Sequence, residues 1–183
     1  GIPETTPDGQ GQLDNLPLGL LKSFEVLRGP SASLYGNASG GVIYLNTLDS
    51  IENKVAQFKV IFGSFGFQSY QLNTSLKNEK TVALIHANRI LTDGYRQNSG
   101  FEQNLFNLKV KHQFTAQSNM QIQLNYTNSP IAEDAGGLTL EDTEADWRKA
   151  RQRNIDYDTY ETIDHFKAGV RWEQNWRRKW NLD

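Results

Sequence analysis

From about Lys54 onward, apolar and polar side chains alternate along the chain in repeated runs. A period of two places the apolar members of each run on one face of a β-strand. The first 50 residues differ, because they are rich in glycine and proline and hold only brief apolar runs. The pattern predicts short strands near 24–28 and 41–47, then six longer strands at 55–64, 69–77, 81–92, 105–114, 119–127 and 165–176.

The apolar face of the longer strands is well defined in every run but one. In 81–92 the two faces are ambiguous, because Arg89 falls in step with Ala83, Ile85 and Ala87. In the other runs we expect one face to point outward, away from the rest of the molecule. This outward set includes Phe58, Val60, Phe106, Leu108, Ile122, Leu124, Val170 and Trp172.

Two features favour a transmembrane β-barrel over a soluble β-sandwich, whose strands would alternate in the same way. The polar face is rich in Gln, Asn, Lys and Arg, which suits a water-filled lumen. Aromatic side chains gather toward the strand ends, as in the two aromatic girdles of outer-membrane barrels. One predicted level holds Phe114, Trp176 and Trp180, and the other holds Phe101, Phe106 and Tyr126. The outward face is therefore expected to meet lipid, and the soluble sandwich stays open as the alternative.

The predicted links between the six longer strands alternate in length. They run at 63–67, 78–80, 93–103, 115–118 and 129–164. Outer-membrane barrels alternate short periplasmic turns with longer extracellular loops. We therefore expect the first, third and fifth links to be extracellular, and the sheet to be one antiparallel meander without helical crossovers.

Composition limits the class of protein only loosely. The chain has 183 residues, a net charge of −2, a mean hydropathy of −0.63 and no cysteine. No apolar run approaches the ~18 residues that a membrane-spanning helix needs, but barrel strands average out as hydrophilic. The near-neutral charge gives no support for nucleic-acid binding. The absence of cysteine excludes disulfides and thiolate–metal sites.

One stretch, residues 24–43, carries a long specific motif: FEVLRGPSASLYGNASGGVI. It resembles, almost without interruption, the plug signature of TonB-dependent outer-membrane receptors. Segments 1–3 and 7–12 also look like the mid-plug region of that family, and segments 63–66 and 93–99 look like its early barrel. Segment 136–151 is similar to the branch that includes ferric-dicitrate receptors.

The resemblance implies an all-β fold in which a transmembrane antiparallel barrel follows a small mixed α+β plug domain. Residues 1–50 would be the C-terminal half of the plug, with a helical turn near 31–35, and residues 54–183 the first barrel strands. Family barrels have about 22 strands, and about six are predicted here. Because the chain begins at Gly1 without a leader, and an open sheet would leave unpaired edges, we expect a fragment of a longer receptor.

The signature residues are expected to have structural or gating roles. Proline lacks the donor that a strand ladder needs, so Gly29-Pro30 should end a strand. Glycines in the signature permit positive φ or close backbone approach. The resemblance implies that Arg28 lies at the contact between plug and barrel, and a simple surface charge is the alternative. The full set is Glu25, Arg28, Gly29, Pro30, Tyr35, Gly36, Gly40 and Gly41.

The resemblance further implies active uptake of a scarce nutrient, most often a ferric chelate, across the outer membrane of a Gram-negative bacterium. TonB would energise it through a segment outside this chain, and the other expected partners are the chelate and outer-membrane lipid, with no nucleic acid. No catalysis, resident metal or cofactor is expected, since iron would enter only within the transported chelate. Guanidinium groups bind carboxylates bidentately. The candidate ligand contacts are Asp8, Gln10 and Gln12 at the plug apex, with Trp147, Arg148, Arg151 and Arg153 in the fifth link.

Several alternatives remain open. The link 130–164 holds ten acidic against four basic residues, so each candidate arginine could instead be a solvated, neutralised charge. These acids lack the spacing of a calcium loop, and His86, His112 and His165 fall on separate strands as ordinary polar residues. A receptor of this family that imports cobalamin, a glycan or another metal complex is the nearest functional alternative. A passive porin, which lacks the plug motif, and a soluble β-sandwich binding module are the others.

Overall fold

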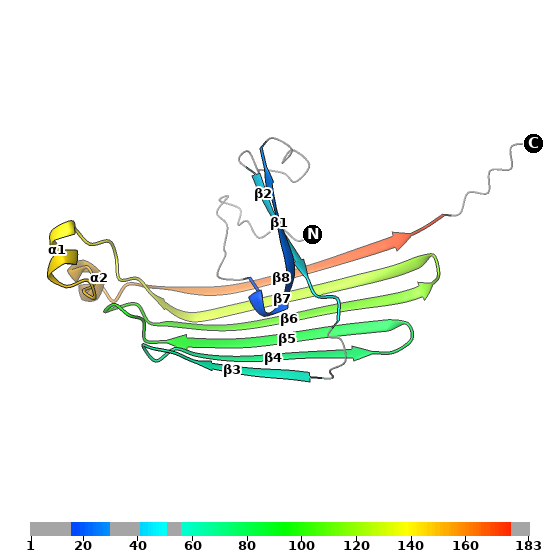
Figure 1. Cartoon of the computed structure of the whole chain (residues 1–183), viewed down its shortest axis with the longest axis horizontal. Coiled ribbons are helices and arrows are strands. Elements are labelled where there is room, and N and C mark those ends of the chain that lie inside the picture. The colour runs from blue at the N-terminus through cyan, green and yellow to red at the C-terminus, as the bar shows by residue number, and fades with distance from the viewer. Residues whose placement is uncertain (1–15, 30–40, 51–55, 177–183) are drawn as a thin grey trace, which may run out of the picture.

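The computed structural model describes residues 16–29, 41–50 and 56–176. They form two antiparallel sheets (Figure 1). The first is a hairpin of β1 (Leu21–Arg28) and β2 (Gly41–Thr47), preceded by the 3-10 turn η2 (Leu18–Leu20). The second sheet contains, in this spatial order, β3 (Ala56–Phe62), β4 (Gln68–Lys77), β5 (Thr81–Thr92), β6 (Phe101–Thr115), β7 (Ser118–Glu133) and β8 (Tyr160–Gln174).

The six-stranded sheet is a meander, because every strand pairs antiparallel with the strand that follows it. This confirms the predicted antiparallel all-β architecture without helical crossovers for the described part of the chain. Two short helices, α1 (Leu140–Ala145) and α2 (Gln152–Asp156), lie in the last link. Neither these nor any other helix among the described residues has the length and apolar character to cross a membrane.

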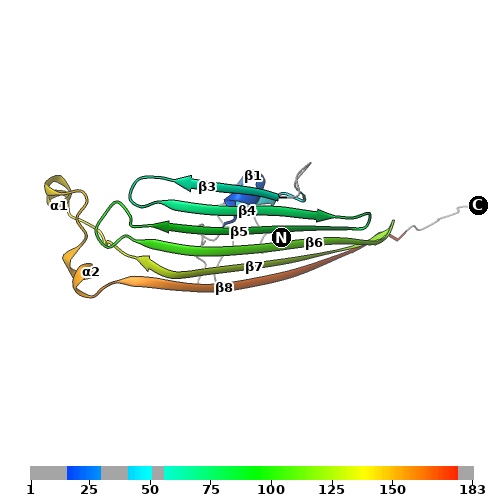
Figure 2. The same cartoon turned by 90° about the horizontal axis from the view of Figure 1, so that it is seen from below.

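Long and short links lie at opposite ends of the sheet (Figures 1 and 2). Segments 63–67, 93–100 and 134–159 share one end, and the turns 78–80 and 116–117 share the other. Side chains close both tight turns: Asn78 Oδ1 accepts from the backbone of Lys80 and Thr81 at 3.0 and 2.7 Å, and Thr115 Oγ1 accepts from Gln117 N–H at 3.2 Å. The predicted alternation of link lengths is confirmed.

The strands at the long-link end extend further than the sequence pattern predicts. β6 begins at Phe101 and β7 ends at Glu133, several residues beyond the predicted limits. The pairing of β7 shifts register around Pro130, which has no N–H for the ladder, and Ser129 Oγ donates to Glu102 O at 2.6 Å. The bulge shifts the alternation of faces, so side chains before and after it do not follow one period of two. The sequence pattern therefore does not mark these strand ends.

The register gathers the predicted outward residues on one face of the sheet. One cross-strand row runs through Phe58, Leu72, Ala87, Phe106, Tyr126 and Phe166. The opposite face holds buried polar side chains, namely Ser69, Asn73, His86, Gln103, Asn107, Thr127 and Ser129. Phe58, Val170 and Trp172, in contrast, are 67%, 70% and 55% exposed. A soluble sandwich would bury the apolar face, so this inverted arrangement favours a barrel wall.

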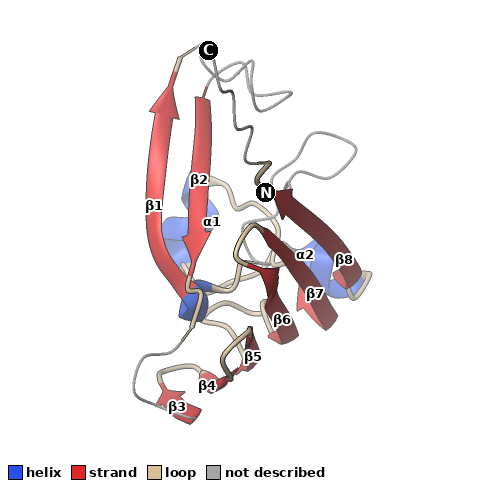
Figure 3. Cartoon of the chain, turned by 90° about the vertical axis from the view of Figure 1, so that its right-hand side faces the viewer, coloured by secondary structure: helices blue, strands red, loops and turns tan. Residues whose placement is uncertain are grey.

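The β1–β2 hairpin stands over the concave, polar face of the sheet (Figure 3). The apolar residues therefore face away from the hairpin, as predicted. The ambiguous run 81–92 is also resolved. Arg89 lies on the apolar face between Tyr70 and Asn104, and its Nη2 lies 2.9 Å from Glu102 Oε1.

One predicted aromatic position was wrong. Phe101 was grouped with Phe106 and Tyr126 as a girdle level, but it pairs with Thr92 and lies an odd number of residues from Phe106. It therefore falls on the polar face. Phe106 and Tyr126 do pair directly with each other on the apolar face. Trp180 lies outside the described residues.

Candidate functional site

The β1–β2 hairpin contains the described part of the signature motif. Glu25 pairs with Tyr44, and Arg28, an exposed residue at the end of β1, pairs with Gly41. Gly41 has φ of +143°, and a Cβ added there would lie 2.6 Å from Leu27 O. Only glycine fits this position, as expected from the motif. Asp8, Gln10, Gln12, Pro30, Tyr35, Gly36, Gly40 and the turn predicted near 31–35 lie outside the described residues.

The hairpin touches the sheet first through η2, which packs on β4 and β5. A Cβ at Gly19 would lie 2.9 Å from His86 Cε1 and 3.3 Å from Gln71 Oε1. The imidazole is fixed by a 2.5 Å hydrogen bond from its Nδ1 to Asn73 Oδ1, and Leu20, the last residue of η2, is buried. The absence of a side chain at Gly19 therefore allows the 3-10 turn to lie against the polar face.

The second contact is an ion cluster immediately after β2. Asp49 Oδ1 lies 2.6 Å from Lys109 Nζ and 2.7 Å from Lys111 Nζ, both on β6. Lys109 also donates to Thr47 Oγ1 and Leu48 O, each at 3.3 Å. Desolvation raises the pKa of the Asp49 carboxyl, but hydrogen bonds and Coulombic attraction from the two lysines outweigh it and lower that pKa from 3.8 to about 2.

The two contacts form one unit, because Leu48 N–H donates to Leu20 O at 2.8 Å. We call Leu18–Leu20 together with 47–49 the foot. It attaches the hairpin to three neighbouring strands, β4, β5 and β6. Sequence reasoning missed all of its residues. The available signal was weak: two lysines at a spacing of two on the polar face, and a single acid after the predicted strand.

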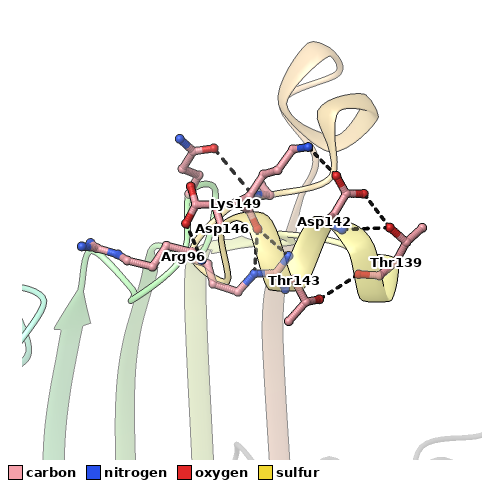
Figure 4. Close-up of polar contacts among 9 residues, drawn as sticks. Arg96, Thr139, Asp142, Thr143, Asp146 and Lys149 are labelled. Carbon is pink, nitrogen blue, oxygen red and sulfur yellow. Dashed lines mark hydrogen bonds and ion pairs between the residues drawn. The ribbon is translucent and has the colours of Figure 1, made fainter.

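The end of the sheet with long links is ordered by contacts between the links themselves. Gln97 N–H donates to Arg148 O at 2.9 Å, and the Arg96 guanidinium donates to Lys149 O. The helix α1 is capped by Thr139, whose Oγ1 accepts from Asp142 N–H at 3.2 Å (Figure 4). A 2.5 Å ion pair between Asp142 and Lys149 lowers the pKa of the former and raises that of the latter.

Aromatic residues from three links form an exposed cluster at this end. Tyr95 stacks on Trp147 with ring centres 5.9 Å apart, and its other neighbour is Phe65 at 6.2 Å. Arg148 joins the cluster, because its guanidinium carbon lies 5.5 Å from the Phe65 ring centre and its Nε donates to Tyr95 O at 3.0 Å. Trp147 and Arg148 therefore both contact Tyr95, and Arg148 also contacts Phe65.

Arg151 and Arg153 lie elsewhere, around an open pocket of about 350 Å³. Asn154, Tyr157 and Thr159 complete its lining. The Arg153 guanidinium carbon lies 5.8 Å from the Tyr157 ring centre, and both arginines are exposed. The pocket thus presents two guanidinium groups, an amide, a phenol and a threonine, and none of the described residues that line it has a carboxylate.

Residues 1–42 match the family model of the TonB-dependent receptor plug domain. The chain is a segment of a TonB-dependent receptor. Proteins with this plug domain are outer-membrane transporters rather than enzymes. The six-stranded sheet of the receptor accordingly has the character of a barrel wall, with its polar face toward the plug hairpin.

In the receptor the foot is a contact between plug and barrel wall. The resemblance implies that Arg28 contacts carboxylates of barrel parts outside this chain, and that role stays a prediction. Within the described residues, the foot supplies contacts through Gly19 and Asp49. Of the four candidate ligand residues in the fifth link, the structure brings Arg151 and Arg153 together and leaves Trp147 and Arg148 in the aromatic cluster. Their ligand role remains a prediction.

Proposed function

We propose that the receptor takes up a ferric chelate, either a siderophore or ferric citrate, with energy supplied through TonB. The observation that carries the proposal is the pocket around Arg151 and Arg153, at the long-link end of the sheet. Two guanidinium forks suit a ligand rich in carboxylate or other anionic oxygens. Iron would be cargo within the chelate, and the protein would need no metal of its own.

The acidity of the surrounding link is the main objection to an anionic ligand. Hydrogen bonds within the links answer part of it, because they occupy the carboxylates. Asp134 accepts from Asn154 Nδ2 and Gly136 N–H, Asp146 from Arg148 N–H, and Asp156 from Gln152 Nε2. Asp142 is paired with Lys149. The bonds from neutral donors leave the carboxylates charged but direct them at donors within the links, and the two guanidinium groups are the charged groups among the five residues that line the pocket.

The test is ferric-citrate binding to the purified full-length receptor. The double variant Arg151→Ala, Arg153→Ala should bind at least tenfold more weakly, because charge-assisted hydrogen bonds contribute ~1.5–3 kcal/mol each. The matched control is Arg89→Ala with Arg171→Ala, which removes the same charge outside the link 134–159. It should leave the affinity within about threefold.

Equal affinities of the two double variants would remove the arginine pocket from the ligand site. Failure of the wild-type receptor to bind ferric citrate would redirect the search within the family. Cobalamin, glycans and other metal complexes would then be the ligands to titrate.

A further inference from the structure

The arginine pocket is built on the link 134–159, which projects beyond the sheet between β7 and β8 (Figure 1). A link of this length needs fixed points if its side chains are to keep one arrangement, because ordering each backbone residue costs about 1–2 kcal/mol of conformational entropy. The described residues show where these fixed points lie. They come from the neighbouring link 93–100.

Arg96 supplies the first fixed point. Its Nε and Nη2 donate to Lys149 O at 3.0 and 2.9 Å, and Nη2 also donates to Ala135 O at 3.2 Å. A single half-buried guanidinium therefore binds carbonyls from both halves of the link 134–159. Arg96 and Lys149 are labelled in Figure 4. Ala135 and Ala150 beside these carbonyls are buried, so water could not easily replace the guanidinium.

Asn98 supplies the second. Its Nδ2 donates to Asp134 O at 2.9 Å and to Thr159 O at 3.1 Å, the first and last residues of the link. Asp134 N–H also donates to Thr159 O at 3.0 Å, which closes the neck directly. Asn98 adopts φ of +50°, a left-handed conformation that asparagine tolerates better than most residues.

Both fixed points connect to the pocket through shared acceptors. Ala135 O accepts from Arg96 and also from the backbone N–H of Arg151, at 2.8 Å. Asp134 O accepts from Asn98 and also from Asn154 Nδ2, at 3.0 Å. Thr159, which Asn98 binds through its carbonyl, lines the pocket as well. Three of the five pocket residues are thus linked to Arg96 or Asn98 through a single carbonyl oxygen. They are Arg151, Asn154 and Thr159.

We infer that Arg96 and Asn98 are positioning residues that hold the arginine pocket in its binding shape before a ligand arrives. They touch no ligand themselves. Preorganisation raises affinity because the ordering cost is met during folding and not during binding. This inference rests on the proposed function for the identity of the ligand, but the structural claim, that the two side chains fix the pocket, does not.

The experiment uses the full-length receptor in detergent with four variants. Arg96→Ala and Asn98→Gly remove the donors, and glycine keeps the positive φ at position 98. Arg96→Lys keeps the charge and part of the donor capacity. Arg89→Ala removes an arginine at the same end of the sheet, whose ion-pair partner is Glu102 on β6. Heat-modifiability on gels verifies that each barrel is folded.

The first readout, backbone hydrogen exchange over 134–159, needs no ligand. Arg96→Ala and Asn98→Gly should exchange roughly tenfold faster than wild type, the change that about 1.4 kcal/mol produces. Arg96→Lys should be intermediate, and Arg89→Ala unchanged. Unaltered exchange in both donor deletions would overturn the inference whatever the substrate is.

The second readout is equilibrium titration with ferric citrate. Arg96→Ala and Asn98→Gly should weaken binding roughly tenfold while the number of sites per folded receptor stays constant, whereas general misfolding would lower the number of sites. Faster exchange with unchanged affinity would show that the pocket does not depend on the two residues, which also overturns the inference. If the wild-type receptor does not bind ferric citrate but the variants still exchange faster, the positioning role is supported. Only the proposed ligand is then contradicted.

Discussion

At the scale of single residues, the plug–barrel contact depends on small features that gain meaning only in the fold. Gly19 is one of 15 glycines in the chain, and it matters because a Cβ there would lie only 2.9 Å from His86 Cε1. Asp49 is one carboxylate among many, yet among the described residues it is the one placed against two lysines of β6. Neither position has a local signal, because the partners lie on strands far along the sequence, 60 residues away for the pair Asp49 and Lys109.

Asp49 makes the docking of the plug dependent on pH in a predictable direction. Its folded-state pKa of about 2 lies below the ordinary 3.8, so its stabilising contribution is present above pH ~4 and is lost as the pH falls through ~2. We expect the thermal stability advantage of wild type over Asp49→Asn to be constant from pH 7 to about 4.5 and to vanish by about pH 2. Melting curves of both receptors across this range would measure it. A difference that already disappears near pH 4 would place the carboxylate outside the lysine pair.

At the scale of elements, the alternation of apolar and polar residues predicted the strands and the faces of the sheet. The central parts of β3 to β8 and the order of short and long links followed from alternation and turn residues, as did the two strands of the plug hairpin. The ends of β6 and β7 did not, because the bulge at Pro130 shifts the register. The arginines could be chosen by residue type, but their grouping could not. Only the fold of the link separates Arg151 and Arg153 from Arg148.

The two faces of the sheet predict opposite responses to a new charge. Leu108 and Ile122 lie in the apolar face opposite the plug, and an arginine there should destabilise the inserted barrel by ~2–4 kcal/mol if the site is near mid-membrane. Asn119→Arg is the matched control, since Asn119 lies on the same strand as Ile122 but on the polar face, with Nδ2 3.1 Å from Glu173 Oε2. Urea titration of the folded receptors in lipid vesicles would compare the three. Equal stability of Ile122→Arg and Asn119→Arg would contradict the face assignment.

At the scale of the whole molecule, the plug hairpin and the barrel wall of the receptor meet through the foot. The plug hairpin stands on the polar wall, and the foot joins it to β4, β5 and β6 through η2 and the Asp49 cluster. The rest of the wall's polar face mixes amides, such as Asn107 and Asn125, which hydrogen-bond to each other, with further charged side chains, such as Lys167 and Arg171. The lysine pair is the charged group of this wall that Asp49 contacts.

Charge reversal should show whether this selection holds the plug in place. Asp49 is partly exposed, with a side-chain accessibility of 58%, so Asp49→Asn should lose only ~1 kcal/mol or less. Asp49→Lys would instead bring three ammonium groups together, and repulsion would replace attraction. We expect this variant to loosen the plug, seen as a lower first melting transition and greater sensitivity of the cells to a bulky antibiotic. The triple variant Asp49→Lys, Lys109→Asp, Lys111→Asp restores opposite charges across the contact and should recover most of both properties. If the triple variant is as leaky as Asp49→Lys alone, the ion cluster does not hold the plug in place. The packing of η2 on His86 would then be the contact that attaches the foot to the wall.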